Sequence, residues 1–321
     1  MNSVNQNRTN IRTRIALGSW ALADPLWPGQ RRNDSIQVIH SAIRLGIRNF
    51  DTARAYGNGQ AEQLVGQQLK RFRHELNRDS YSISTKIMVP AEPSQTRTLI
   101  ESSLRRLCTD YVDIVYLHWP SSKRNAAPVL DKLVELRAEG KIHAIGLSNF
   151  TARMIEELVR TYPIEWCQLP LSLLWRRALS DSIPLCKRLG MKTVSYGTFG
   201  FGLLSGKYRN SQDFTEGDWR KNIFCFKDPY RSTVSELVAL LQEIGKRCNL
   251  APHEVALKWV LDQPVDQVIL GARTRSQLEQ TMNAITNIDE IDIDVSKVNE
   301  LSIHLDNIVC SDVDNPFFHV W

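Results

Sequence analysis

The chain has few cysteines, and no two of them are spaced as a Cys-x-x-Cys pair. Six cysteines scattered over 321 residues do not indicate a disulfide framework or a zinc site. We therefore expect reduced thiols and no bound metal. The cysteines are Cys108, Cys167, Cys186, Cys225, Cys248 and Cys310.

Long apolar runs are also missing. No stretch approaches the roughly 18 apolar residues that span a bilayer, and residues 1–14 lack the apolar segment of a secretory signal. These absences predict a cytoplasmic protein with no membrane partner.

Charge of one sign is not concentrated anywhere in the chain. Lys and Arg total 40, Asp and Glu total 35, and no block of five like charges occurs. We therefore expect no nucleic-acid partner and favour a locally bound anionic ligand. The oligomeric state stays open.

Short apolar or β-branched runs alternate with segments of helical period. In residues 35–45, for example, Ile36, Ile39 and Ile43 share one helical face. No adjacent strand candidates are joined by a two-residue turn, so the pattern predicts a parallel sheet with crossover helices. The eight strand candidates are residues 15–17, 46–50, 81–85, 111–117, 142–145, 164–169, 192–195 and 267–270.

The spacing of polar residues after the strands favours a closed barrel over a doubly wound sheet. Asp51, Lys86, His118 and Ser148 follow one another at intervals of 35, 32 and 30 residues, one strand and one helix per step. In a barrel these strand ends meet at one rim. The first strand is also not followed by a Gly-x-Gly-x-x-Gly turn. We predict an α/β fold, a (β/α)8 TIM barrel that forms a single domain over residues 1–321.

Three segments lie outside the repeat. Residues 1–13 form a polar N-terminal arm, and residues 197–232 are rich in glycine and predicted to be a long loop on the barrel rim. Loops of that length are often lids or binding loops. The apolar tail, residues 308–321, is expected to pack across the barrel.

Asp51, Tyr56, Lys86 and His118 stand at or just beyond predicted strand ends, where barrel enzymes keep their catalytic groups. Each alone has an ordinary explanation, such as a helix cap or a solvated cation. Together they suggest acid–base chemistry, because a buried Lys86 ammonium would lower the pKa of the Tyr56 phenol and Asp51 would be its counter-ion. His118 could donate a hydrogen bond to a substrate carbonyl.

The segments around these four residues resemble the aldo-keto reductase family, and the likeness runs from about residue 15 to residue 283. The resemblance implies that Asp51, Tyr56, Lys86 and His118 are catalytic. The segments are Phe50-Asp51-Thr52-Ala53-Arg54-Ala55-Tyr56-Gly57, Ser84-Thr85-Lys86 and Tyr116-Leu117-His118-Trp119-Pro120.

The same resemblance implies that a nicotinamide cofactor lies along the strand ends. Residues 145–150 are similar to the segment that holds the carboxamide, Tyr196 to the ring that stacks on the nicotinamide, and residues 202–208 to the pyrophosphate loop. The implied cofactor-binding residues are Gly18, Ser19, Trp20, Asp51, Ser148, Asn149, Gln168, Tyr196, Gly197, Leu203, Ser205, Lys207, Gly271, Arg273, Gln277, Gln280 and Thr281.

The sequence departs from the family pattern at some of these contacts. Residues 197–199 read Gly-Thr-Phe where Ser-Pro-Leu is expected, and Ser172 and Thr281 stand where the family has Asn. The implied substrate pocket is apolar. Its residues are Trp20, Trp27, Tyr56, His118 and Trp119.

These residues predict a reductase that transfers hydride to an aldehyde or ketone while Tyr56 donates the proton. NADPH is preferred to NADH because Arg273 and Arg275 follow the eighth strand, where the resemblance places the adenosine ribose, and guanidinium groups bind phosphate well. Two alternatives remain: a nicotinamide-binding regulatory subunit that resembles the β subunits of potassium channels, and a redox-neutral epimerase with a bound cofactor.

Overall fold

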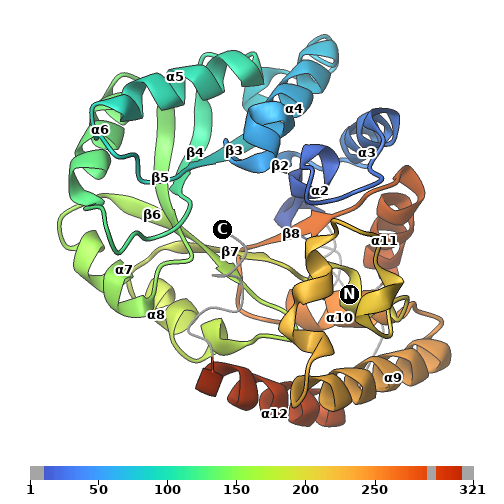
Figure 1. Ribbon diagram of the computed structural model, residues 1–321. Helices are drawn as coiled ribbons and strands as arrows, with labels where there is room; N and C mark the ends of the chain where they lie inside the picture. Colours follow the sequence, from blue (N-terminus) through green and yellow to red (C-terminus); the bar gives the residue numbers. More distant parts are fainter. Residues whose placement is uncertain (1–10, 288–293, 313–321) are drawn as a thin grey trace, which may run out of the picture.

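The computed structural model describes residues 11–287 and 294–312. Eight parallel strands close into a barrel in the order β1 to β8, which confirms the predicted fold (Figure 1). Each strand candidate of the sequence falls on one of them. The strands are β1 (Ile15–Gly18), β2 (Asn49–Asp51), β3 (Ser82–Ile87), β4 (Val112–Leu117), β5 (Ile142–Ser148), β6 (Ile164–Pro170), β7 (Lys192–Tyr196) and β8 (Gln267–Gly271).

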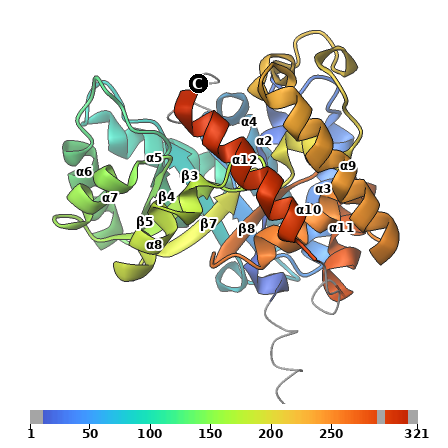
Figure 2. The ribbon, with the colours of Figure 1, turned by 90° about the horizontal axis from the view of Figure 1, so that it is seen from below.

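Helices surround the barrel, and α12 packs beside α9 outside this ring (Figures 1 and 2). No helix in the described ranges combines the length and the hydropathy needed to cross a bilayer. The helices are α2 (Trp20–Ala23), α3 (Arg32–Arg44), α4 (Gln60–Arg71), α5 (Gln95–Leu107), α6 (Ala127–Ala138), α7 (Ala152–Val159), α8 (Ser182–Arg188), α9 (Tyr230–Cys248), α10 (Pro252–Leu261), α11 (Arg275–Asn287) and α12 (Ser296–Asp312).

Strand β3 shows how the barrel positions its side chains. Ile83 is fully buried, and Thr85 donates a hydrogen bond to Glu62 of α4, so this face of the strand turns toward the helices. Ser84 and Lys86 alternate with them and donate to Asp51 inside the barrel. The alternation of the strand therefore brings Lys86 and Asp51 together although they are far apart in sequence.

The rim loop is shorter than predicted, because α9 already begins at Tyr230. Within the loop the chain forms short 3-10 helices, among them η5 (Gly200–Ser205) and η7 (Trp219–Asn222). The predicted N-terminal arm lies mostly, and the predicted C-terminal tail partly, outside the described residues. Within the described part, residues 308–312 continue α12.

Candidate active site

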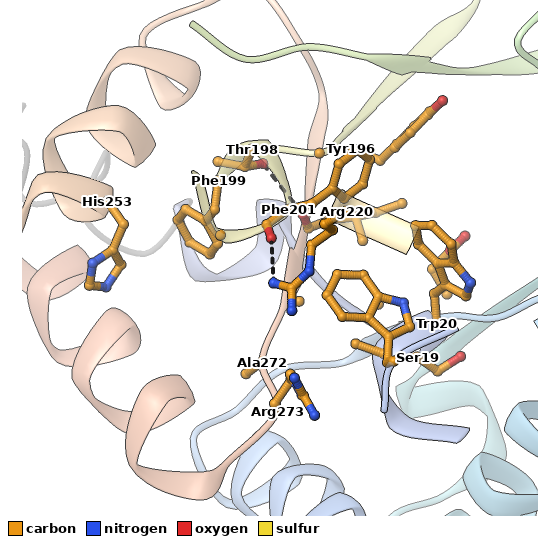
Figure 3. A pocket seen from close by; sticks show the side chains of 18 of the residues that line it. Ser19, Trp20, Tyr196, Thr198, Phe199, Phe201, Arg220, His253, Ala272 and Arg273 are labelled. Atoms are coloured by element: carbon orange, nitrogen blue, oxygen red, sulfur yellow. Dashed lines mark hydrogen bonds between the residues drawn. The ribbon is translucent and has the colours of Figure 1, made fainter. Parts of the chain in front are cut away.

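A pocket of about 410 Å3 opens at the carboxyl ends of the strands. Gly18, Asp51, Ser148, Tyr196 and Gly271 all line it, and each is the last residue of its strand. This is the end of the barrel at which TIM-barrel enzymes carry their sites. Figure 3 shows the part of the pocket formed by the rim loop and its neighbours.

The four predicted catalytic residues meet at this pocket. Lys86 Nζ donates to Asp51 Oδ1, to Thr52 O at 2.9 Å and to Tyr56 Oη at 3.3 Å. Asp51 is 4% exposed and Lys86 is 1% exposed, so their charges are paired away from solvent. The His118 ring lies edge-on to the Tyr56 ring, with centroids 5.6 Å apart. Tyr56 and His118 line the pocket, and Lys86 lies behind Tyr56.

The pKa of the Tyr56 phenol differs from the sequence-based expectation. Burial raises it well above its ordinary value, and the Asp51 carboxylate raises it further. Burial also lowers the pKa of Lys86, against the opposing effect of Asp51. The expected lowering of the tyrosine pKa by Lys86 is therefore outweighed in the free protein, because the phenolate would form in a nearly dry site. Tyr56 is thus a protonated phenol at neutral pH.

His118 is held in its neutral form. Burial lowers the pKa of its imidazole well below the ordinary value, and the Lys86 ammonium lowers it further. A neutral imidazole can donate one hydrogen bond while adding no charge to the site. This suits a group that orients a carbonyl oxygen beside the Tyr56 phenol.

Aromatic rings wall the pocket above Tyr56. Trp20 stacks on Tyr56 with centroids 6.0 Å apart, and its ring contacts Trp27 and Trp219, each at 5.3 Å. Phe201 packs on Trp219 at 4.9 Å. Trp20 and Trp27 are among the predicted substrate residues, whereas sequence reasoning missed Trp219 and Phe201 of the rim loop. Trp119, also predicted, is buried and lines the pocket.

The predicted carboxamide-binding residues form one hydrogen-bonded group. Asn149 Nδ2 donates to His118 O at 3.0 Å and to Ser148 Oγ at 3.1 Å, and the Tyr196 hydroxyl donates to Asn149 Oδ1 at 2.6 Å. Gln168 Nε2 donates to Asp51 Oδ2 at 2.9 Å. The amide side chains thereby connect the predicted cofactor residues to the predicted catalytic ones.

Most of the predicted cofactor residues line this pocket, but two do not. Leu203 is 2% exposed and its side chain packs in the hydrophobic core. Gln280 is exposed on α11, while Gln277 and Thr281 of the same helix face the pocket. The difference arises because positions 277 and 281 are one helical turn apart and share a face that position 280 does not.

The polar groups of the pocket fit a dinucleotide cofactor. Ser19 Oγ is buried and, within the described part of the chain, has no hydrogen-bond partner. Gly202 of the rim loop has φ 97°, a conformation in which a glycine lets backbone approach a ligand closely. Lys207 and Arg273 add positive charge, and Asp51 is the only carboxylate among the described lining residues.

Arg220 is a pocket residue that sequence reasoning missed. It belongs to η7 of the rim loop and is 3% exposed. Its Nη2 lies 2.6 Å from Asp218 Oδ2, and its Nη1 donates to Phe201 O at 3.0 Å (Figure 3). The guanidinium also lies 4.7 Å from the centre of the Trp27 ring. Arg220 therefore fastens two parts of the rim loop to the aromatic wall.

We expect Asp218→Asn to loosen the rim loop. Removing one charge of a buried ion pair costs about 3–5 kcal/mol, so native-state proteolysis within the loop should quicken by about a hundredfold or more. The matched control is Asp228→Asn in the same loop, because Asp228 is 80% exposed in its pair with Arg231. Equal cleavage rates for both variants would contradict this role of the buried pair.

The two arginines after β8 have different surroundings. Arg273 lines the pocket, donates through Nε to Gln30 Oε1 at 3.0 Å and through Nη2 to Pro28 O at 2.6 Å. Arg275 is exposed and pairs with Glu279 at 2.7 Å. Neither Arg275 nor Glu279 lines the pocket. Arg273 is therefore the cation at the predicted adenosine end.

Comparison with known proteins identifies a family. The model of the aldo/keto reductase family matches residues 14–302. The aldo-keto reductase YhdN of Bacillus subtilis is 31% identical over 95% of this chain and 93% of its own length. The NADH-specific methylglyoxal reductase of Escherichia coli is 30% identical over 90% of this chain and 94% of its own.

Solved structures give the same result. The glycerol dehydrogenase AKR11B4 from Gluconobacter oxydans has a TM-score of 0.76 and 26% identity, over 94% of this chain and 93% of that one. Together with the family match, this confirms the resemblance read from the motifs. The chain belongs to the aldo/keto reductase family and is an oxidoreductase that uses a nicotinamide cofactor.

Proposed function

We propose that the protein reduces an aldehyde or ketone to an alcohol, with NADPH as the hydride source and Tyr56 as the proton donor. The observation that carries this proposal is the buried cluster at the pocket floor, where Lys86 donates to Tyr56 Oη and pairs with Asp51. The neutral His118 lies edge-on to the same phenol. A phenol and a neutral imidazole side by side can both donate to one carbonyl oxygen.

Each of these residues has a defined task. A reduced nicotinamide, when bound, supplies the hydride. His118 orients and polarises the carbonyl, and Tyr56 gives its proton to the oxygen as negative charge develops there. The Lys86 ammonium then stabilises the Tyr56 phenolate, and Asp51 keeps Lys86 in place. The aromatic wall of Trp20, Trp27, Trp219 and Phe201 excludes water from the reacting groups.

The residues that would hold the cofactor follow from the pocket lining. Ser148, Asn149 and Gln168 offer amide and hydroxyl groups to the carboxamide, and the Tyr196 ring offers a stacking surface. Lys207 and the backbone around Gly202 would contact the pyrophosphate. These roles are the ones that the family resemblance implies, and the fold brings the residues concerned to one pocket.

The preference for NADPH rests on Arg273. The charge of Arg220 is already balanced by Asp218. The side-chain hydrogen bonds of the half-buried Arg273 to described residues go instead to the uncharged Gln30 and Pro28. Glu279, the carboxylate closest to it in sequence, is paired with Arg275 and does not line the pocket. A relative is named as NADH-specific, so the choice of cofactor needs its own experiment.

We expect Arg273→Ala to weaken NADPH binding by roughly ten- to a hundredfold and to leave NADH binding nearly unchanged, because charge-assisted hydrogen bonds contribute ~1.5–3 kcal/mol each. Isothermal titration calorimetry with both cofactors measures this. Arg275→Ala is the matched control, since that arginine is exposed and paired with Glu279. Equal losses for both cofactors would mean that Arg273 acts by holding Pro28 and Gln30 rather than a phosphate.

The reductase proposal is tested by turnover. Aldehydes, ketones, sugars and keto acids are incubated with NADPH or NADH, and the loss of nicotinamide absorbance is followed over many turnovers. Methylglyoxal and the oxidation of glycerol belong in the panel because two relatives carry those names. A reductase turns over repeatedly, a regulatory subunit stalls near one turnover, and an epimerase shows no net absorbance change.

The cytoplasmic location stays a prediction.

A further inference from the structure

The interior of this barrel is unusually polar on one side. TIM-barrel interiors are mostly filled by bulky branched side chains. Here β2 and β3 place Asn49, Ser82 and Ser84 inside, and β8 adds Gln267. Asn49, Ser82 and Gln267 are the first residues of their strands, so they lie at the end of the barrel opposite the pocket.

These residues line a second cavity of about 10 Å3, which is room for about one water molecule. Asn49, Ser82 and Gln267 are only half-buried, so this end of the cavity lies close to the surface at the amino-terminal end of the barrel. At its inner end it is bounded by Asp51 and Tyr116, which are 4% and 1% exposed. Asp51 therefore lies between the two spaces and lines both the active-site pocket and this cavity.

Ser84 links the second cavity to Asp51. Its neighbours Ile83 and Thr85 are fully buried, but Ser84 is only half-buried, and it lines the second cavity and not the pocket. Its hydroxyl donates to Asp51 Oδ2 at 2.8 Å. On the other carboxylate oxygen Asp51 accepts from Lys86, which in turn donates to Tyr56. A continuous hydrogen-bonded path therefore runs from the cavity to the phenol.

We propose that Tyr56 regains its proton from solvent at the amino-terminal end of the barrel, through a water molecule in the second cavity, Ser84, Asp51 and Lys86. The inference rests on the proposed reductase function. After Tyr56 gives its proton to the product oxygen, the Lys86 ammonium passes a proton to the phenolate and is left as a neutral amine. Ser84 then donates its hydroxyl proton to the Asp51 carboxylate as it takes one from the cavity water, and bulk solvent reprotonates the hydroxide that remains. The protonated Asp51 finally passes its proton to Lys86, which restores the ammonium and the carboxylate.

The proposed path lets a proton reach Tyr56 when water cannot enter the pocket. Substrate and cofactor would fill the pocket above Tyr56, and the aromatic wall covers it, so water from that side is excluded during the reaction. A route from the opposite end of the barrel delivers the proton without opening the pocket. Ser84 is in this scheme a positioning residue that acts through Asp51.

Two variants interrupt the path in different ways. Ser84→Ala removes the hydroxyl that donates to Asp51, and Ser82→Leu fills the mouth of the cavity while Ser84 is kept. We expect both to lower kcat by roughly tenfold, less than the loss of the general acid itself. KM should not change, because neither residue lines the pocket. The matched control is Ser195→Ala, a buried strand serine whose hydroxyl donates to Gln267 O at 3.4 Å.

The solvent isotope effect separates a proton path from a structural role. In both variants reprotonation becomes slow, so kcat in D2O relative to H2O should fall further than it does for wild type. A high-resolution crystal structure of the wild type should show a water molecule within hydrogen-bond distance of Ser84 Oγ, and that of Ser82→Leu should not. Thermal unfolding checks that each variant is folded.

The possible outcomes are distinct. An active wild type whose Ser84→Ala and Ser82→Leu variants keep its kcat and isotope effect overturns this inference alone. A loss of kcat in Ser84→Ala only, with an unchanged isotope effect, also overturns it, because Ser84 would then merely hold Asp51. Wild type that reduces no carbonyl overturns the proposed function, and the inference with it.

Discussion

Tyr56→Phe is expected to lower carbonyl reduction by at least about 100-fold while nicotinamide binding stays nearly unchanged. The substitution removes the transferable proton and keeps the ring that stacks on Trp20. Steady-state turnover measures the first effect, and calorimetric titration with NADPH and NADH measures the second. Binding and chemistry should separate in this variant.

The control for this experiment is Tyr162→Phe, which also removes a hydroxyl. Tyr162 donates to Ala127 O at 3.1 Å, away from the pocket, so its loss should leave turnover unchanged. If Tyr56→Phe keeps more than about a tenth of wild-type turnover, Tyr56 is not the general acid.

Lys86→Met is expected to abolish most of the activity and to move the alkaline limb of the pH profile to higher pH. Tyr56 must be protonated to donate, so activity falls as the pH rises through its pKa. Burial already raises that pKa. Removing the neighbouring ammonium takes away the group that favours the phenolate, so the pKa rises further and the limb shifts upward.

The loss of rate has the same cause. The phenolate that forms during the reaction would have no cation beside it, and Asp51 would be left as a buried charge without its partner. Lys192→Met is the matched control, because Lys192 also lies on a barrel strand but is exposed. Retained activity with an unmoved limb would show that Lys86 does not act on Tyr56.

The closed barrel was predictable from sequence because its signal is repetitive. The first five strand candidates begin 30 to 35 residues apart, and the residues that follow them are polar. Helices α9 and α10 were not identified, although Val234, Leu237, Leu241 and Ile244 are spaced as one helical face. The predicted loop, residues 197–232, overlaps only the first three residues of α9, so the helical period of the rest was available in the sequence.

The strand-end residues of the candidate site were predictable for the same reason, and those of the rim loop were not. Phe201 and Arg220 line the pocket because the rim loop folds back over the barrel. No period or motif in the sequence indicates that. The pKa of Tyr56 could not be predicted either. Burial of the phenol raises its pKa, and burial of Lys86 lowers the pKa of the ammonium that would oppose this. The extent of burial depends on the whole fold, so the direction of the shift cannot be read from the sequence.

The aromatic wall has an optical consequence. Trp20, Trp27 and Trp219 have ring centroids within 5.3 to 6.0 Å of one another, so light absorbed by one indole is shared rapidly among the three. A reduced nicotinamide absorbs where tryptophan emits, and a cofactor in the pocket would lie next to this cluster. The protein therefore carries a built-in fluorescent reporter, whose emission should fall when a reduced cofactor binds and recover when hydride transfer oxidises it.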